Sequence, residues 1–153
     1  MSLPQSADPG VLALLDAQEV RYEVLDGAVV VTPPARFSHE RLVPRLAAAL
    51  LVGAPPGLEV LGPNYAFRYA PGSFLLPDLL VARREDCDEL GTSVAPLLVV
   101  EVLSPSTWRR DRGEKRAVYA ESGVLHYWLV DPDGPSVTVH RLVDGRYEQQ
   151  ALQ

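Results

Sequence analysis

The chain has 153 residues, the usual length of one domain, and its 47% hydrophobic and 22% charged content excludes a disordered or fibrous protein. Its formal net charge of -6 argues against nucleic-acid binding, because Lys and Arg supply phosphate affinity, although a local basic patch can outweigh the total. One cysteine excludes an intrachain disulfide, and with no apolar membrane-spanning stretch or secretory signal we expect a cytoplasmic protein.

The N-terminal segment is predicted to form a short helix followed by a β-hairpin. Asp8 and Pro9 have the N-cap and first-turn positions of a helix. Two strands, 21–25 and 28–31, flank Asp26-Gly27, which is a strong hairpin turn signal.

A longer helix and three strands are expected next. The helix runs from residue 39 toward residue 51 with Ser38 as its cap, and Pro44 requires it either to start later or to kink. The strands are predicted over 58–61, 65–69 and 74–82.

A crossover unit is predicted in the second half of the chain. The nearly apolar run 97–103 indicates a strand buried on both faces, followed by a helix over 109–122 with Gly123 at its end and a strand over 126–130. The last two strands are expected to form a hairpin, over 137–142 and 146–149.

Two acidic residues lie in strongly apolar segments. Glu101 lies within the 97–103 strand, and Asp78 lies within the predicted 74–82 strand. A buried carboxylate needs a partner or a metal, and two on adjacent strands repel each other unless a cation intervenes. Oxygen ligands favour Mg²⁺ or Mn²⁺, so Asp78 and Glu101 are candidate metal ligands.

Lys115 is the third candidate, on the helix that follows the strand of Glu101. It shares a helix face with Asp111 and Val118, from which it could lean over the strand ends. A lysine there would orient an attacking water or offset charge on a transition-state phosphate.

Each candidate also has an ordinary structural interpretation. Asp78 could be a turn or cap residue after Pro77, and Lys115 could be a solvated helix lysine. Glu101 could be half of a buried salt bridge, with Arg109 or Arg112 as its partner.

Several short motifs surround these candidate residues or lie elsewhere along the chain. They are Leu76-Pro77-Asp78, Leu98 to Thr107 (LVVEVLSPST), Asp111 to Lys115 (DRGEK), Tyr119, Gly123-Val124, Tyr127 to Asp131 (YWLVD), the upstream Tyr22 to Gly27 (YEVLDG) and the Ser38-His39 helix start. Together they resemble the Uma-two family of restriction-endonuclease-like proteins, over about residues 20–148.

The resemblance implies membership of the PD-(D/E)xK nuclease superfamily. Asp78 matches the Asp of the "PD" and Glu101 matches the (D/E), which implies metal binding by Asp78, Glu101 and the carbonyl of Val102. Leu103 stands where the motif has its lysine, so the resemblance implies that Lys115 takes over that role. His126 replaces a Glu that the family usually has before Tyr-Trp, and activity would weaken if that Glu assists the site.

Other residues are weaker candidates. Glu23 could be an outer metal ligand or a solvent-facing strand residue. His39 could contact phosphate or carry a proton, or it could be a structural or exposed histidine. Asp111 could equally cap the helix or pair within it. A dense basic-aromatic cluster could line a phosphate track beside the site or form a solvated first helical turn; it comprises Trp108, Arg109, Arg110 and Arg112.

The combined expectation is one α+β domain over residues 1–153. It would have a restriction-endonuclease-like mixed sheet flanked by helices, with N-terminal and C-terminal β-hairpins. Its predicted activity is Mg²⁺- or Mn²⁺-dependent hydrolysis of DNA phosphodiester bonds, with a homodimer expected by analogy. The alternatives are a binding module of the same fold with weak or no catalysis, and a hydrolase of RNA or small phosphoesters.

Overall fold

The computed structural model describes residues 7–134 and 136–151, which form helices, a short 3₁₀ turn and strands. Among these residues no helix is long and apolar enough to cross a membrane. The helical elements are α1 (Pro9–Ala17), α2 (Phe37–Gly53), η1 (Arg84–Asp86), α3 (Trp108–Arg112) and α4 (Glu114–Glu121). The strands are β1 (Tyr22–Leu25), β2 (Ala28–Val31), β3 (Leu58–Leu61), β4 (Ala66–Ala70), β5 (Ser73–Leu75), β6 (Leu79–Arg83), β7 (Gly91–Thr92), β8 (Leu98–Val102), β9 (His126–Asp131), β10 (Ser136–Val143) and β11 (Arg146–Gln150).

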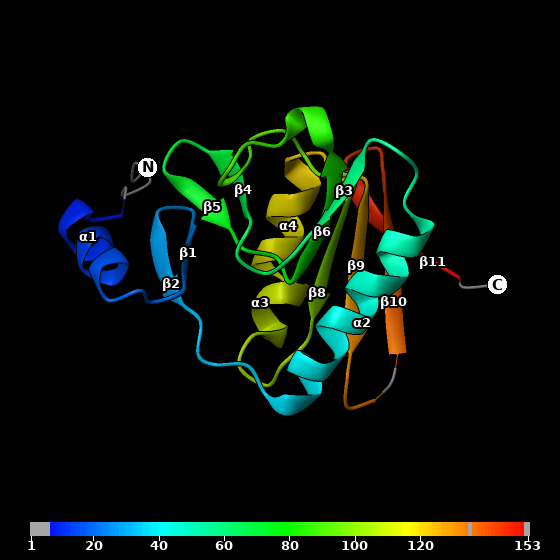
Figure 1. Ribbon diagram of the computed structural model, residues 1–153, viewed down its shortest axis with the longest axis horizontal. Helices are drawn as coiled ribbons and strands as arrows, with labels where there is room; N and C mark the ends of the chain where they lie inside the picture. The colour runs from blue at the N-terminus through cyan, green and yellow to red at the C-terminus, as the bar shows by residue number, and fades with distance from the viewer. Residues whose placement is uncertain (1–6, 135, 152–153) are drawn as a thin grey trace.

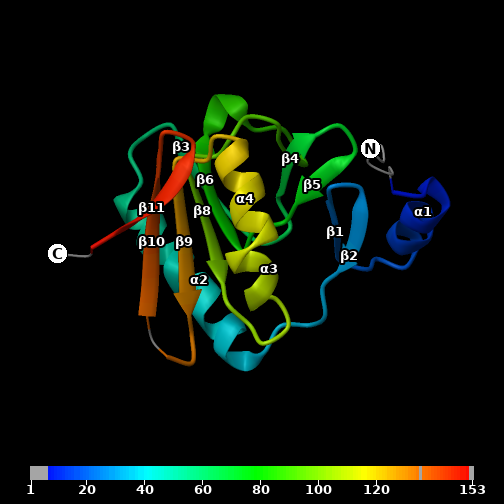
Figure 2. The same ribbon diagram turned by 180° about the vertical axis from the view of Figure 1, so that it is seen from behind.

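The strands form two mixed sheets. The smaller has the order β2-β1-β5-β4-β7 and the larger has the order β11-β10-β9-β8-β6-β3. Strand β8 pairs with β9 in parallel, and α3 and α4 make the crossover between them. Helix α2 covers one face of the larger sheet, while α3 and α4 cover the other (Figures 1 and 2). This arrangement confirms the predicted α+β class and both terminal hairpins.

Strand β8 is the centre of the core, because all five of its residues are buried. Successive side chains of a strand point to opposite faces. Val100 packs in the cluster beside α2, whereas Val99 packs with Tyr119 of α4. Glu101 is therefore directed to the face covered by α4.

Local signals at the N-terminus behave as predicted. Asp8 caps α1, and its Oδ1 accepts hydrogen bonds from the backbone N–H groups of Gly10 and Val11 at 2.7 and 3.3 Å. The turn between β1 and β2 places Asp26 and Gly27 at φ 49° and 82°. A two-residue turn with both φ values positive matches the right-handed twist of the strands, and Asp-Gly favours it.

The expected strand over 74–82 is wrong, because it is two strands that belong to different sheets. The chain leaves the smaller sheet after Leu75 and joins the larger one at Leu79. Pro77 lies between them, and a proline has no N–H to donate to a ladder. This interruption leaves Asp78 immediately before β6, at the junction of the two sheets.

The two longer helices also differ from expectation. Helix α2 begins at Phe37 with Arg36 at its N-cap, so the predicted cap by Ser38 is wrong, and Pro44 lies inside the helix rather than delaying its start. The helix predicted over 109–122 is wrong as a single element. It breaks at Gly113, which has φ -112° and ψ -95° between α3 and α4.

His140 of β10 gives the fold a dependence on pH. It is buried beside Tyr127 and Tyr147, with its Nδ1 3.2 Å from the Tyr127 carbonyl oxygen. Burial lowers the pKa of its imidazole below the ordinary 6.5. As the pH falls, the unfolded chain therefore takes up this proton before the folded chain does, and stability decreases.

We expect His140→Phe to reduce this loss of stability on acidification. The free energy of unfolding would be measured by urea denaturation at about pH 7.5 and about pH 5. The native chain should lose more stability between the two than the variant, since all other titrating groups are shared. An equal loss in both proteins would show that His140 does not titrate in this way.

Candidate active site

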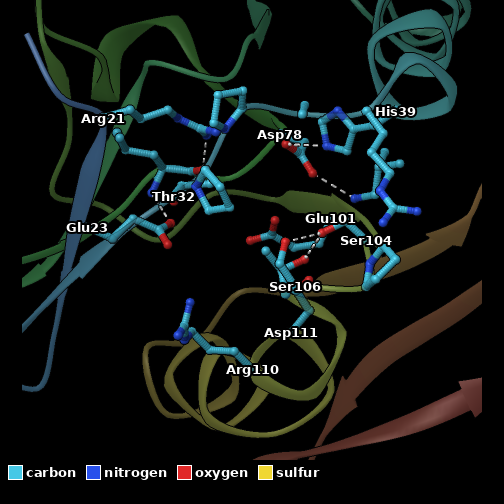
Figure 3. Close-up of a pocket in the computed structure, with 18 of the residues that line it drawn as sticks. Arg21, Glu23, Thr32, His39, Asp78, Glu101, Ser104, Ser106, Arg110 and Asp111 are labelled. Carbon is cyan, nitrogen blue, oxygen red and sulfur yellow. Dashed lines mark hydrogen bonds and ion pairs between the residues drawn. The ribbon is translucent and has the colours of Figure 1, made fainter.

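All the predicted site residues except Arg109 and Arg112 line one pocket of about 420 Å³. Its walls come from β1, the segment between β2 and α2, the first turn of α2, the residues before β6, the end of β8, and α3 with α4. Figure 3 shows Glu101 near its centre, with Glu23, Asp78 and Asp111 around it. We call this the site pocket.

Asp78 is held on both carboxylate oxygens. Its Oδ2 accepts a hydrogen bond from the backbone N–H of Val102 at 2.8 Å, and its Oδ1 lies 3.0 Å from Nε2 of His39. The antiparallel pairing of Leu79 with Val100 brings the residue before β6 to the end of β8, which explains the contact with Val102. Asp78 and Glu101 thus meet at one edge of the larger sheet, as the sequence predicted.

Glu101 is 3% exposed, and one of its oxygens receives two donors. Its Oε1 lies 3.0 Å from Nζ of Lys115 and accepts a hydrogen bond from the Tyr119 hydroxyl at 2.7 Å. Burial raises the pKa of the Glu101 carboxyl well above its ordinary value, while the nearby Lys115 charge opposes that shift. The partner of Glu101 is Lys115, and neither Arg109 nor Arg112 forms the alternative salt bridge with it in the described residues.

Lys115 is the only lysine of the chain, and it is 5% exposed. Its Nζ lies 3.0 Å from Oε1 of both Glu101 and Glu23, and 3.7 Å from Oδ1 of Asp111. Burial alone would lower the pKa of this ammonium, but the carboxylates of Glu101, Glu23 and Asp111 raise it above the ordinary value. Lys115 is therefore a buried, charged group and not a solvated helix lysine.

The burial of Lys115 predicts protection from amine reagents. In the folded chain, a short pulse of an acylating reagent should leave Lys115 unmodified. After unfolding in denaturant, the same pulse should modify it. Mass spectrometry of the digested protein reads out Lys115 in both samples, and a small peptide amine added to each sample serves as the control for reagent activity. Equal modification of Lys115 in the folded chain would contradict its burial.

Glu23 joins the site from the smaller sheet. It is 3% exposed, and its Oε1 accepts a hydrogen bond from the backbone N–H of Leu76 at 2.7 Å as well as contacting Lys115. Its interpretation as a solvent-facing strand residue is therefore wrong. The two contacts tie β1 to the segment that carries Asp78 and to α4.

Asp111 contributes a fourth buried carboxylate, at 1% exposure. It does not cap α3, whose N-cap residue is Thr107. Its Oδ1 has no hydrogen-bond partner among the described residues, and burial raises the pKa of this carboxyl. An unsatisfied buried carboxylate oxygen is unfavourable unless a cation or water reaches it.

His39 lies in the first turn of α2 and contacts Asp78 directly. That hydrogen bond raises the pKa of its imidazole, although burial acts in the opposite direction. Its Nδ1 is buried without a hydrogen-bond partner in the described part of the chain. His39 is thus part of the site and not an exposed histidine.

The predicted basic cluster is only partly at the site. Arg110 lines the site pocket, whereas Arg112 lines a neighbouring pocket and Arg109 lies over the Trp108 ring. Two arginines that sequence reasoning missed, Arg21 and Arg36, line the site pocket instead. Neither belongs to a motif with a recognisable spacing, so only the fold reveals them.

The structure changes the interpretation of two further residues, Tyr119 and His126. Tyr119 was noted only as part of a motif, yet its hydroxyl contacts Glu101. His126 pairs with Leu98 at the opposite end of β8 from the site, because Glu101 is opposite Leu129. The substitution at His126 therefore does not change a residue lining the site pocket.

The donor chemistry of the pocket fits a hard divalent cation. Four carboxylates at most 5% exposed, from Glu23, Asp78, Glu101 and Asp111, face one buried ammonium. No three His, Cys, Asp or Glu side chains of residues 7–134 and 136–151 are already arranged around a common metal position. Mg²⁺ is commonly held by one or two carboxylates, with waters and substrate phosphates completing the octahedron.

Comparisons with known proteins agree with the motifs and the fold. The model of the family described as "Uma2: Putative restriction endonuclease" matches residues 9–153. A crystal structure described as a putative nuclease from Anabaena variabilis has a TM-score of 0.71 and 18% identity, over 86% of this chain and 76% of that chain. At that identity the likeness shows the fold alone. A search of curated proteins gave no match. Because the family model spans nearly the whole sequence, the chain belongs to the Uma2 (Uma-two) family.

Proposed function

We propose that this chain is a nuclease that hydrolyses DNA phosphodiester bonds with the help of Mg²⁺ or Mn²⁺. The observation that carries the proposal is the meeting of Asp78, Glu101 and Lys115 in one pocket, from three separate elements. Family membership and the nuclease-like fold support the same reaction class.

Asp78 and Glu101 would hold the metal, together with the backbone carbonyl of Val102, which lines the site pocket. A bound divalent ion would polarise the phosphate and lower the pKa of an attacking water. Asp78 is already oriented by His39 and by the Val102 N–H. Such preorganisation keeps a ligand in position before the substrate arrives.

Lys115 would stabilise the negative charge that develops on the phosphate. Glu23 and Glu101 fix its ammonium from two sides, so little reorganisation is needed during the reaction. In the usual motif the lysine follows the acid by two residues on the same strand, where this chain has Leu103. Here Lys115 of α4, which follows β8 and α3 in the chain, would supply the equivalent charge.

The direct test is cleavage of plasmid and single-stranded DNA by the purified native chain. The expected result is cutting with Mg²⁺ or Mn²⁺ and none with EDTA. The exposed variant Glu89→Gln should cut like the native chain, since Glu89 lies outside the site pocket. Absence of cutting with either metal would overturn the proposal.

The second candidate is a binding module that keeps the fold without catalysis. It is favoured by the contacts of Asp78, whose two oxygens already have protein partners in the described residues. Binding of Mn²⁺ or DNA without any cleavage would support it.

The homodimer, which we expect by analogy with other nucleases of this fold, stays a prediction within this proposal. One copy supplies one site, so cutting both strands of a duplex at one place would require two copies. Sedimentation of the chain with and without duplex DNA measures the assembly. A monomer in both conditions would restrict the activity to single-strand cuts.

A further inference from the structure

A second pocket of about 380 Å³ shares a wall with the site pocket. Ser104 and Pro105 line both cavities, so they form the ridge between them. On the far side of this ridge the lining includes Trp108 and Asp133. We call this cavity the flanking pocket. Nothing in the chemistry of Asp78, Glu101 and Lys115 requires it.

Trp108 is the exposed aromatic residue of the flanking pocket. It is 42% exposed at the start of α3, whereas Trp128 packs against the apolar cluster beside α2. The guanidinium of Arg109 lies over the Trp108 ring, with Cζ 5.2 Å from the ring centroid. A partly exposed indole ring can stack with a second planar group.

Both pockets carry charged groups of both signs. In the site pocket Arg21, Arg36 and Arg110 lie with the buried carboxylates, and their guanidinium groups suit phosphate. Arg112, Asp131 and Asp133 line the flanking pocket, where the two carboxylates can accept hydrogen bonds from amino groups of bases.

The loop that carries these acids is fixed by its own hydrogen bonds. Oδ1 of Asp131 accepts from the backbone N–H groups of Asp133 and Gly134 at 3.0 and 3.1 Å. These bonds fix the Asp131 side chain and the turn that carries Asp133, and both residues line the flanking pocket together with Trp108.

We infer that the flanking pocket receives an unpaired nucleobase next to the phosphate bound in the site pocket, with the base stacked on Trp108 and its amino edge toward Asp131 and Asp133. The identity of that phosphate as part of a DNA strand rests on the proposed function. A base within a duplex is stacked on both faces and its pairing edge is occupied, so it cannot make these contacts. The preferred substrate is accordingly a single-stranded or locally unpaired strand.

The fluorescence of Trp108 tests this placement directly. The variant Trp128→Phe leaves Trp108 as the only tryptophan, because the chain has two. The variant would be titrated in EDTA with oligodeoxycytidylate, oligodeoxythymidylate and a duplex of equal length. We expect the cytosine strand to quench most strongly, since its amino group suits a carboxylate, the thymine strand to quench less, and the duplex to quench least.

Affinities for a labelled cytosine strand, measured by fluorescence anisotropy on the otherwise native chain, give a second readout. Loss of one stacked base should weaken binding by about 5- to 150-fold in Trp108→Ala, while Trp108→Phe should keep most of the affinity. Asp133→Asn should reduce the preference for cytosine over thymine.

Three results would overturn the inference. The first is that none of the three nucleic acids binds. The second is that the duplex binds as tightly as the single strands and quenches the Trp108 fluorescence as strongly. The third is that Trp108→Ala binds the cytosine strand with unchanged affinity. The nuclease proposal fails separately. Strand binding at Trp108 with no cutting in Mg²⁺ would contradict only the cleavage, whereas metal-dependent cutting with unchanged Trp108→Ala affinity would contradict only the base pocket.

Discussion

Asp78→Asn is expected to reduce the rate of DNA cleavage by about a thousandfold or more. Asn has nearly the same shape as Asp but removes one negative charge from the proposed metal site. Loss of several kcal/mol of charge stabilisation, taken as about 4 kcal/mol, corresponds to roughly three factors of ten in rate. The measurement is the single-turnover rate of cutting a labelled oligonucleotide in Mn²⁺.

We expect Asp78→Asn to remain folded, so that a change in its cleavage rate can be attributed to the site. Asn keeps an oxygen that can accept from the Val102 N–H, as Oδ2 of Asp78 does at 2.8 Å. Urea denaturation of the variant checks that it is folded, and Glu89→Gln serves as the charge-matched control. A cutting rate within about threefold of the native rate would remove Asp78 from the catalytic machinery.

Lys115→Met is expected to abolish cleavage and also to destabilise the fold. Methionine fills much of the same volume, but Glu23, Glu101 and Asp111 would lose the ammonium that balances them. Removal of one partner from a buried ion pair costs about 3–5 kcal/mol, because the remaining charge stays buried without compensation. The free energy of unfolding, measured by urea denaturation, tests this loss.

The double variant Lys115→Met/Glu101→Gln separates stability from catalysis. Removing a buried carboxylate together with the lysine should recover part of the lost stability, because the two effects are coupled. Cleavage should remain absent in this folded protein, since both groups belong to the proposed site. If Lys115→Met were as stable as the native chain, the proposal that Lys115 balances the buried carboxylates would be wrong.

The main elements of the site could be predicted because their sequence context is unusual. A glutamate within the buried run 97–103 and an aspartate within 74–81 stand out against apolar neighbours. The spacing of Asp111 and Lys115 predicted their shared helix face, and their 3.7 Å approach survives the break at Gly113. Local patterns of this kind require no knowledge of tertiary contacts.

The contacts that complete the site depend on tertiary structure. Glu23 lies on β1 of the smaller sheet and Lys115 lies on α4, far away in the sequence, and tertiary packing brings their side chains to 3.0 Å. The approach of His39 to Asp78 likewise depends on where α2 crosses the larger sheet. The division of 74–82 into two strands was missed because its apolar pattern is nearly continuous across Pro77.

The measurement that tests the account most directly is the cleavage rate as a function of Mn²⁺ concentration, for the native chain, Asp78→Asn and Glu101→Gln in parallel. The account predicts a rate that rises to saturation for the native chain, is absent in EDTA, and stays near background for both variants at every concentration. Cutting that persists in EDTA, or that both variants retain, would contradict a metal-dependent site built on Asp78 and Glu101.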